Sequence, residues 1–196
     1  SDLYHFVDRL EQMGQEYWQI LPTNEPNDSN SPYDTNSAFA QNPMFISLES
    51  LLSDSLLENT DFTDIIHQDS SKIDFDRLKK WKFPLLLKAA KIFQRRYKQN
   101  QNNDFTAFCK MNEHWLDSYA AYKVLKDKNN DLPWFDWNDD LKCFNGNEIE
   151  RVLRNEVEEL EIIKIIQYFF NKQWHSLKKY ANEKNVSLIG DLPIYI

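Results

Sequence analysis

The sequence predicts an α/β fold that is mostly helical, with a few short strands paired in parallel. Hydrophobic residues follow a helical period through most of the segment from about residue 50 to residue 185. Two short apolar runs, Glu16–Leu21 and Val186–Gly190, read as strands, and each is followed within a few residues by a proline. Because helices separate these strands along the chain, a crossover connection should bring them together in parallel.

The first elements are expected to be a helix and a buried strand. Apolar residues recur at helical spacing near the N-terminus, namely Leu3, Phe6, Val7 and Leu10. Gly14 is placed to end this helix, since glycine adopts the left-handed conformation that commonly terminates one. The strand at Glu16–Leu21 then follows, and Pro22, which has no N–H to donate, closes it.

A long loop comes next. Thr23–Pro43 has no period and is rich in Asn, Ser and Pro, which predicts a loop of roughly twenty residues. Loops of this length inside a domain are usually functional or disordered, and the packing residues Pro32, Tyr33 and Phe39 favour an ordered, functional loop. Met44–Leu48 then reads as a second short strand or extended segment.

The helical stretch has breaks near residues 59–71, 100–103 and 126–146. One aromatic stripe at helical spacing indicates a helix core: Phe105, Phe108, Trp115, Tyr119 and Tyr122. Pro84 interrupts the helix predicted over about 75–98, so either a kink or two shorter helices are expected there.

Composition excludes several functional classes. The 196 residues carry 31 acidic and 23 basic side chains, a net charge of −8, which argues against a nucleic-acid partner. Only three glycines are present, too few and too scattered for a phosphate-binding loop. Cys109 and Cys143 form no CxxC pair, which favours a reducing, cytoplasmic setting. No apolar run reaches the ~18–20 residues of a membrane span, so no membrane partner is expected.

Two places could carry chemistry, because loops after the C-terminal ends of parallel strands hold the functional groups of barrel enzymes. One is Ser31–Asp34, after the first strand, and the other is Asp191, after the last. Each has a simpler interpretation, since Tyr33 could be a loop-packing ring and Asp191 a turn residue before a proline. The four histidines, His5, His67, His114 and His175, lack the spacing of a metal site, so no metal is predicted.

Several motifs, in order and spacing, resemble the amylomaltases, also called 4-alpha-glucanotransferases. The segments that carry the resemblance are Trp18–Pro22, Ser31–Tyr33, Ser37–Ala40, Asn42–Pro43, Leu132–Trp134 with Trp137, Gln173–Trp174, and Ile189–Tyr195. The similarity spans most of the chain and is least specific from about 55 to 130.

The resemblance implies a (β/α)8 TIM barrel with a large helical subdomain inserted after an early strand, of which this chain would form a part. The expected ranges are 1–54 for early barrel elements and the substrate loop, 55–147 for the helical subdomain, and 148–196 for a crossover helix and the next barrel strand. A complete barrel of this type takes about 250 residues, so 196 residues with an insertion are expected to be a fragment.

The resemblance also implies transfer of alpha-1,4-glucan segments between maltooligosaccharides, with retained configuration and no cofactor. Such chemistry uses two carboxylates ~5 Å apart and a covalent intermediate. In the family these carboxylates lie downstream of the segment that matches Ile189–Tyr195, so no catalytic residue is assigned to this chain. By resemblance, Ser31, Tyr33 and Asp191 are the expected substrate-binding residues.

Two alternatives stay open at the level of sequence. One is a stand-alone helical carbohydrate-binding or interaction module without catalysis, although isolated parallel strands would leave sheet edges and apolar faces bare. The other is a different alpha-amylase-like hydrolase, which the ordered Ser31–Tyr33 and Gly190–Pro193 motifs disfavour.

Overall fold

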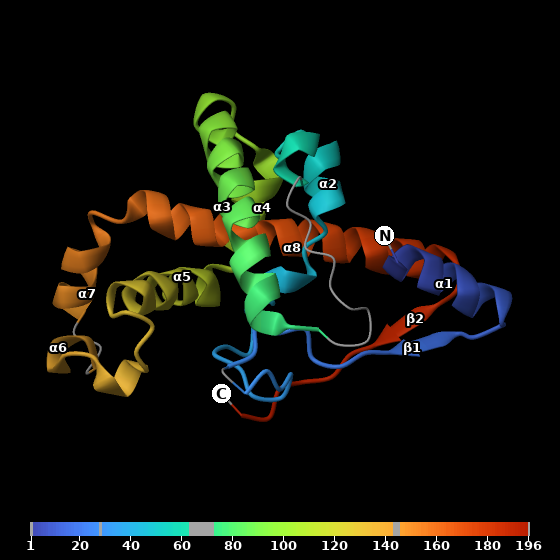
Figure 1. Cartoon of the computed structure of the whole chain (residues 1–196), viewed down its shortest axis with the longest axis horizontal. Helices are drawn as coiled ribbons and strands as arrows, with labels where there is room; N and C mark the ends of the chain where they lie inside the picture. Colours follow the sequence, from blue (N-terminus) through green and yellow to red (C-terminus); the bar gives the residue numbers. More distant parts are fainter. Residues whose placement is uncertain (1, 28, 63–72, 143–145, 196) are drawn as a thin grey trace. The chain divides into compact units, whose positions relative to one another are not determined.

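The computed structural model describes residues 2–27, 29–62, 73–142 and 146–195 (Figure 1). Helices dominate these residues, as the sequence predicts, and two short strands form a parallel sheet. The chain divides into two compact units: unit 1 is Ser1–Ile92 with Gln167–Ile196, and unit 2 is Phe93–Ile166. The domain ranges 1–54, 55–147 and 148–196 stay a prediction.

The expected opening helix and the parallel pairing are both confirmed. Helix α1 spans Asp2–Gln12, and Gly14 follows it with a left-handed φ of 66°. Strand β1 (Tyr17–Gln19) pairs in parallel with β2 (Ser187–Ile189), so that Trp18 lies opposite Leu188. Residues at the two ends of the chain are thereby brought side by side, as Figure 1 shows for the two arrows.

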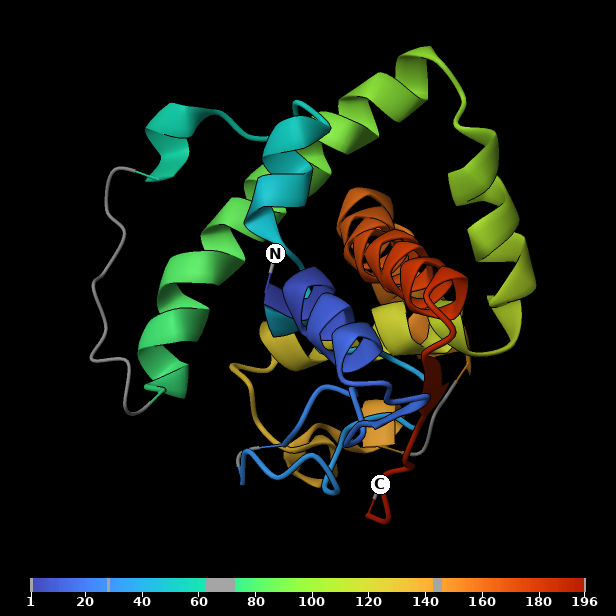
Figure 2. The same ribbon diagram turned by 90° about the vertical axis from the view of Figure 1, so that its right-hand side faces the viewer.

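The prediction that the first strand is buried is wrong. Tyr17 is 63% exposed, and only Trp18, the middle residue of β1, is partly buried. One face of the sheet covers the core between α1 and α8 (Val157–Glu183), two helices that lie close together in Figure 2. The buried members of this core are Val7, Leu10, Leu177, Ala181 and Val186. Alternate residues of β1 point away from this core, which explains the exposure of Tyr17.

The prediction of a strand or extended segment at Met44–Leu48 is also wrong. A 3-10 turn, η1 (Pro43–Phe45), and a short helix, α2 (Leu48–Ser53), occupy this stretch. Asn42 caps the turn by accepting from the Met44 N–H at 2.9 Å, and Ser47 caps the helix by accepting from the Ser50 N–H at 3.3 Å. These caps, with a proline at the first position of the turn, favour helical geometry over a strand.

Of the two alternatives at Pro84, that of two shorter helices is wrong, because α3 runs without interruption over Phe75–Gln99. The remaining helical elements are η2 (Asn59–Phe62), α4 (Asn103–Met111), α5 (Glu113–Lys128), η3 (Trp134–Asp136), α6 (Asp139–Lys142) and α7 (Gly146–Leu153). Within the described ranges, none of the helices has the length and apolar character to cross a membrane.

Unit 2 has its own core, built partly from the predicted aromatic stripe. Phe105, Phe108 and Tyr119 are buried on α4 and α5. A second cluster joins Leu125, Trp137, Leu141 and Ile149. Cys109 is a half-buried free thiol, and burial raises its pKa, while Cys143 lies outside the described residues. Residues 63–72, which include His67 and most of the predicted break near 59–71, lie outside them as well.

Candidate functional site

The loop after β1 is held in an ordered path by its own polar residues. Asn24 is buried, and its side-chain amide donates to the carbonyls of Ser37 and Ala40 at 3.1 and 3.2 Å. Two antiparallel bridges, Asn24 with Gln41 and Pro26 with Thr35, draw the two sides of the loop together. Buried polar groups are nearly always hydrogen-bonded in folded proteins. Because the buried Asn24 amide donates to two carbonyls of the loop, these bonds favour one specific loop conformation. The expectation of an ordered loop is therefore confirmed for the described residues 23–27 and 29–43, and its functional role stays a prediction.

The turn at the end of the loop is organised around the carboxylate of Asp34. The Asn27 amide donates to it at 2.6 Å and the Ser29 hydroxyl at 2.9 Å. These two hydrogen bonds, that from Asn27 above all, hold the pKa of Asp34 below its ordinary value. Asn30 takes a left-handed φ of 54°, which asparagine tolerates better than most residues. The turn therefore needs no glycine at this point.

Ser31 and Tyr33 lie on the returning side of this turn. The Ser31 hydroxyl accepts from the Tyr33 N–H at 3.3 Å. The Tyr33 carbonyl accepts from the N–H groups of Ile194 and Tyr195 at 3.1 and 2.9 Å, and the Thr35 N–H donates to the Tyr195 carbonyl at 3.0 Å. The loop after β1 and the segment after β2 are thus paired through their backbones.

This pairing brings together two of the three predicted substrate-binding residues. The Tyr33 hydroxyl donates to Asp191 Oδ2 at 2.8 Å across 158 residues of sequence. This hydrogen bond raises the pKa of Tyr33 above its ordinary value of 10.0. The other oxygen of Asp191 accepts from the Leu192 N–H at 2.8 Å. Ser31 contacts this pair through the backbone of Tyr33, and substrate binding by all three residues stays a prediction.

The arrangement combines an aromatic ring with an exposed carboxylate. Tyr33 presents a half-buried ring with a polar end, and Asp191 is exposed at the end of a parallel strand. Loops at the carboxyl ends of parallel strands commonly form ligand clefts. A ring face and a carboxylate side by side can hold the apolar face and a hydroxyl of a pyranose together.

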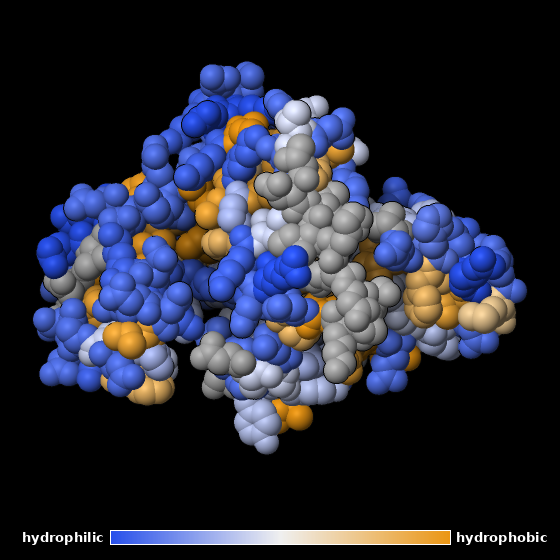
Figure 3. All heavy atoms as spheres, in the orientation of Figure 1, coloured by the Kyte–Doolittle hydropathy of each residue, from blue (hydrophilic) through white to orange (hydrophobic). Residues whose placement is uncertain are grey.

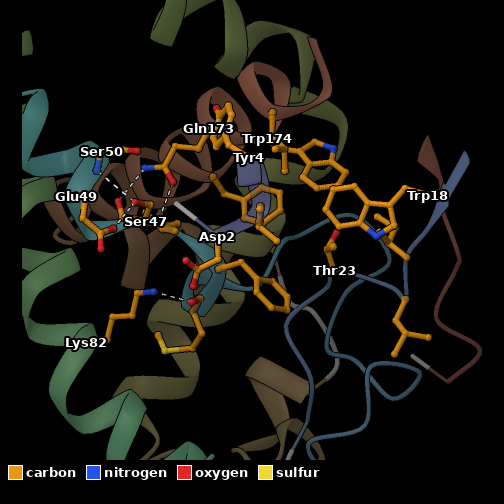
Figure 4. Close-up of a pocket in the computed structure, with 18 of the residues that line it drawn as sticks. Asp2, Tyr4, Trp18, Thr23, Ser47, Glu49, Ser50, Lys82, Gln173 and Trp174 are labelled. Atoms are coloured by element: carbon orange, nitrogen blue, oxygen red, sulfur yellow. Dashed lines mark hydrogen bonds between the residues drawn. The ribbon is translucent and has the colours of Figure 1, made fainter. Parts of the chain in front are cut away.

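Unit 1 also contains a cavity of about 550 Å³ beside β1. In Figure 4, Trp18 and Trp174 lie on one side of it and Lys82, Glu49 and Ser47 on the other. Gln173 fixes the wall at Ser47 with two hydrogen bonds, accepting from the Ser47 N–H at 2.7 Å and donating to the Ser47 carbonyl at 3.1 Å. The cavity is therefore lined by aromatic rings and by a few polar groups whose positions are set by hydrogen bonds.

Lys82 is the residue of this cavity that sequence reasoning missed. Its ammonium donates to the Met44 carbonyl at 2.7 Å, and burial lowers its pKa to about 8 despite the attraction of Glu49. The Glu49 carboxylate is itself held ionised, its pKa lowered mainly by the Ser47 hydroxyl at 2.7 Å. The sequence did contain a signal for this lysine, since Lys82 is the one charged residue among the apolar residues of Trp81–Pro84.

No cluster of three or more His, Cys, Asp or Glu residues that could hold a metal ion occurs in the part of the chain that the structure describes. His5 lies 3.9 Å from Asp8, its neighbour on α1. The His175 ring forms a hydrogen bond with the Asn171 carbonyl within α8, at 2.9 Å. These two histidines therefore have local helix partners.

Comparison with known proteins places the whole chain in one group. Residues 1–196 match the model of the family described as 4-alpha-glucanotransferase. A 4-alpha-glucanotransferase of Clostridium butyricum is 39% identical over 194 residues, which cover 98% of this chain and 39% of that relative. The 4-alpha-glucanotransferase of Aquifex aeolicus is 33% identical over 197 residues, which cover 100% of this chain and 39% of that relative.

A solved structure is similar to this chain and belongs to the same group of enzymes as these relatives. The amylomaltase from Streptococcus agalactiae in complex with acarbose aligns with a TM-score of 0.90 and 30% identity, over 100% of this chain and 39% of that one. This chain therefore spans about two fifths of the length of the relatives it matches, and its two parallel strands and helices correspond to that part of an amylomaltase structure.

Proposed function

This chain belongs to the 4-alpha-glucanotransferase family, and we propose that it forms part of the glucan-binding cleft of an enzyme that transfers alpha-1,4-glucan segments between maltooligosaccharides. Ser31, Tyr33 and Asp191 are the proposed substrate-binding residues. The cytoplasmic setting expected from the cysteines stays a prediction.

The observation that carries the proposal is the hydrogen bond from the Tyr33 hydroxyl to Asp191 at 2.8 Å. It joins the two loops that follow β1 and β2, the place where parallel strands of a barrel direct their functional groups. The half-buried ring of Tyr33 offers a face to a pyranose, and the exposed Asp191 carboxylate accepts hydrogen bonds from sugar hydroxyls. The relative from Streptococcus agalactiae, solved with acarbose, supports a ligand of this chemical class.

The proposed reaction is a retaining double displacement. One carboxylate attacks the anomeric carbon while a carboxylic acid protonates the leaving sugar. An acceptor sugar hydroxyl then replaces the enzyme carboxylate and gives its proton back to the deprotonated acid. We assign neither of these carboxylates to the 196 residues. Tyr33 and Asp191 would bind and orient the donor sugar, and no cofactor enters this scheme.

Titration calorimetry of the chain with acarbose tests the binding role. Replacing Tyr33 by Ala removes the ring, and replacing Asp191 by Ala removes the acceptor, so each should weaken binding about tenfold. Tyr17→Ala is the matched control, because Tyr17 is an exposed tyrosine on β1 with no such partner among the described contacts, and it should bind as the unchanged chain does. Affinity that neither Tyr33→Ala nor Asp191→Ala lowers would contradict the proposed site.

Incubation of the chain with maltotriose tests the assignment of catalysis. We expect neither glucose nor longer maltooligosaccharides, because both catalytic carboxylates are placed outside these residues. Chromatographic detection of longer products would overturn that placement, and glucose alone would indicate hydrolysis by residues of this chain.

A further inference from the structure

Unit 2 carries an exposed apolar patch that the proposed cleft does not use. Leu132 is 47% exposed, Trp134 55% and Phe135 56%, and Pro133 between them is exposed too. We call these four residues the 132–135 patch. In Figure 3, hydrophobic atoms reach the surface between hydrophilic ones on the part of the molecule that carries α5 and α6 in Figure 1. Adjacent large apolar side chains that remain in solvent commonly mark an interaction surface.

The backbone under the patch is firmly held. Two successive residues, Asn130 and Asp131, have left-handed φ angles of 55° and 59°, which non-glycine residues seldom adopt. The Asp131 N–H donates to the Lys126 carbonyl at 3.0 Å, and the Leu132 N–H donates to the Asn129 carbonyl at 3.1 Å. The chain therefore leaves α5 through a specific turn and reaches the patch in a fixed direction.

A buried tryptophan anchors the other end of the patch. Trp137 is 6% exposed, its ring stacks on Tyr122 at 5.7 Å, and its indole N–H donates to the Leu132 carbonyl at 2.9 Å. Its backbone N–H donates to the Trp134 carbonyl at 3.2 Å. With Trp137 turned inward and the loop closed by hydrogen bonds, Trp134 and Phe135 are presented outward in a preorganised way, which lowers the entropy lost on binding.

The geometry of the two rings indicates the shape of a ligand. The Trp134 and Phe135 rings lie 5.9 Å apart with an interplanar angle of 78°. Coplanar rings would suit a flat ligand such as a beta-1,4-glucan, whereas inclined rings suit a chain that curves, as an alpha-1,4-glucan does. Their spacing is also close enough for neighbouring sugars of one chain to contact both.

The surrounding charge indicates the chemical class. Asp131 and Asp136 flank the patch and are exposed, and residues 126–142 hold five acidic and three basic side chains. Carboxylates accept hydrogen bonds from the hydroxyls of a neutral sugar and repel phosphate groups. The flanking charge therefore favours a polyhydroxyl ligand over a nucleic acid.

We propose that the 132–135 patch is a second glucan-binding surface, which takes a curved alpha-1,4-glucan across Trp134 and Phe135 and lies in a different unit from Tyr33 and Asp191. This inference rests on the proposed function for its choice of ligand.

Native affinity electrophoresis of the 196-residue chain tests this proposal, in gels that contain soluble amylose or, as the flat-polymer control, hydroxyethylcellulose. We expect amylose to retard the chain and hydroxyethylcellulose to leave its migration unchanged. In the variant Tyr33→Ala/Asp191→Ala, where the cleft no longer contributes, Trp134→Ala and Phe135→Ala should each raise the apparent dissociation constant for amylose about tenfold. Met111→Ala, a matched change of an exposed apolar residue of unit 2, should leave it unchanged.

The double variant Tyr33→Ala/Asp191→Ala separates this proposal from the proposed cleft. If the patch binds, this variant is still retarded by amylose, and adding Trp134→Ala removes the remaining retardation. Amylose retardation that Trp134→Ala and Phe135→Ala leave intact overturns the patch but not the cleft. Concentration-dependent self-association that Trp134→Ala abolishes, seen by sedimentation in the absence of sugar, also overturns it, since the patch would then bind a second copy of the chain.

Discussion

The side-chain amide of Gln167 pairs with the backbone of Gln41 as a neighbouring β-strand would. The Gln41 N–H donates to Gln167 Oε1 and the Gln167 amide donates to the Gln41 carbonyl, both at 2.9 Å. Gln173 makes the same two-bond contact with Ser47. Helix α8 therefore fixes the chain at two points as it leaves the loop that carries Tyr33.

Replacing Gln167 by Ala should destabilise the chain, because Gln167 is only 3% exposed and the Gln41 backbone would lose two partners. We expect a loss of ~1–3 kcal/mol in the free energy of unfolding measured with urea. Gln167→Glu should also destabilise, since it keeps the acceptor but loses the donor. Gln101→Ala, at an exposed position, is the control and should change the free energy little. Equal stability of Gln167→Ala and Gln101→Ala would disprove the role given to this pair.

Lys82 should make stability depend on alkaline pH. Burial lowers its pKa in the folded chain to about 8, against 10.5 as the ordinary value. Between these values the unfolded chain binds more protons than the folded one, so the free energy of unfolding rises with pH from about 8 to about 10.5. Below about pH 8 the full cost of the buried charge is present, at most ~3 kcal/mol for a shift of this size.

The variant Lys82→Met removes this titration while it keeps a long apolar stem. The difference in stability between the unchanged chain and Lys82→Met, measured by urea unfolding at several pH values, should move in favour of lysine from pH 8 to 10.5. Lys91→Met, at an exposed position of the same helix, should show no such trend. A difference that stays constant across this range would contradict the buried environment of Lys82.

Asp8 should contribute to acid sensitivity. Its pKa lies below the ordinary value of 3.8, mainly because the Tyr180 hydroxyl donates to it at 2.5 Å, and further because Lys184 lies 3.1 Å away. A carboxylate with a lowered folded pKa adds stability at higher pH, and this contribution disappears as the pH falls through the folded pKa.

The comparison of Asp8→Asn with the unchanged chain measures this contribution. The stability difference should be largest near neutral pH and should shrink as the pH falls below about 4, where the unfolded carboxyl becomes protonated. Asp127→Asn, at an exposed position, should show no comparable pH dependence. Thermal unfolding at pH 7, 4 and 3 measures these differences. If the stability difference of Asp8→Asn changed with pH no more than that of Asp127→Asn, the role given to Asp8 would be refuted.

Local signals in the sequence were sufficient for much of the fold. The hydrophobic spacing of α1 and its end at Gly14, the strand before Asp191, and the ordered loop around Tyr33 all follow from short-range patterns. The strand predicted at Met44–Leu48 is wrong, because two caps at Asn42 and Ser47 override the strand character of its apolar residues. The burial predicted for β1 is wrong for another reason, since periodicity identifies a strand but not how much of each face is covered.

The sequence by itself determined most of the helices, the two strands that pair, the family, and Ser31, Tyr33 and Asp191 as candidate residues, because each depends on neighbours close in the chain or on whole motifs. The tertiary structure alone decided that Tyr33 donates to Asp191, that Gln167 pairs with Gln41 and that Lys82 donates to the Met44 carbonyl. These contacts join residues that are distant in sequence, and no spacing along the chain reports them. They form only when packing brings the elements together and leaves each buried polar group in need of a partner.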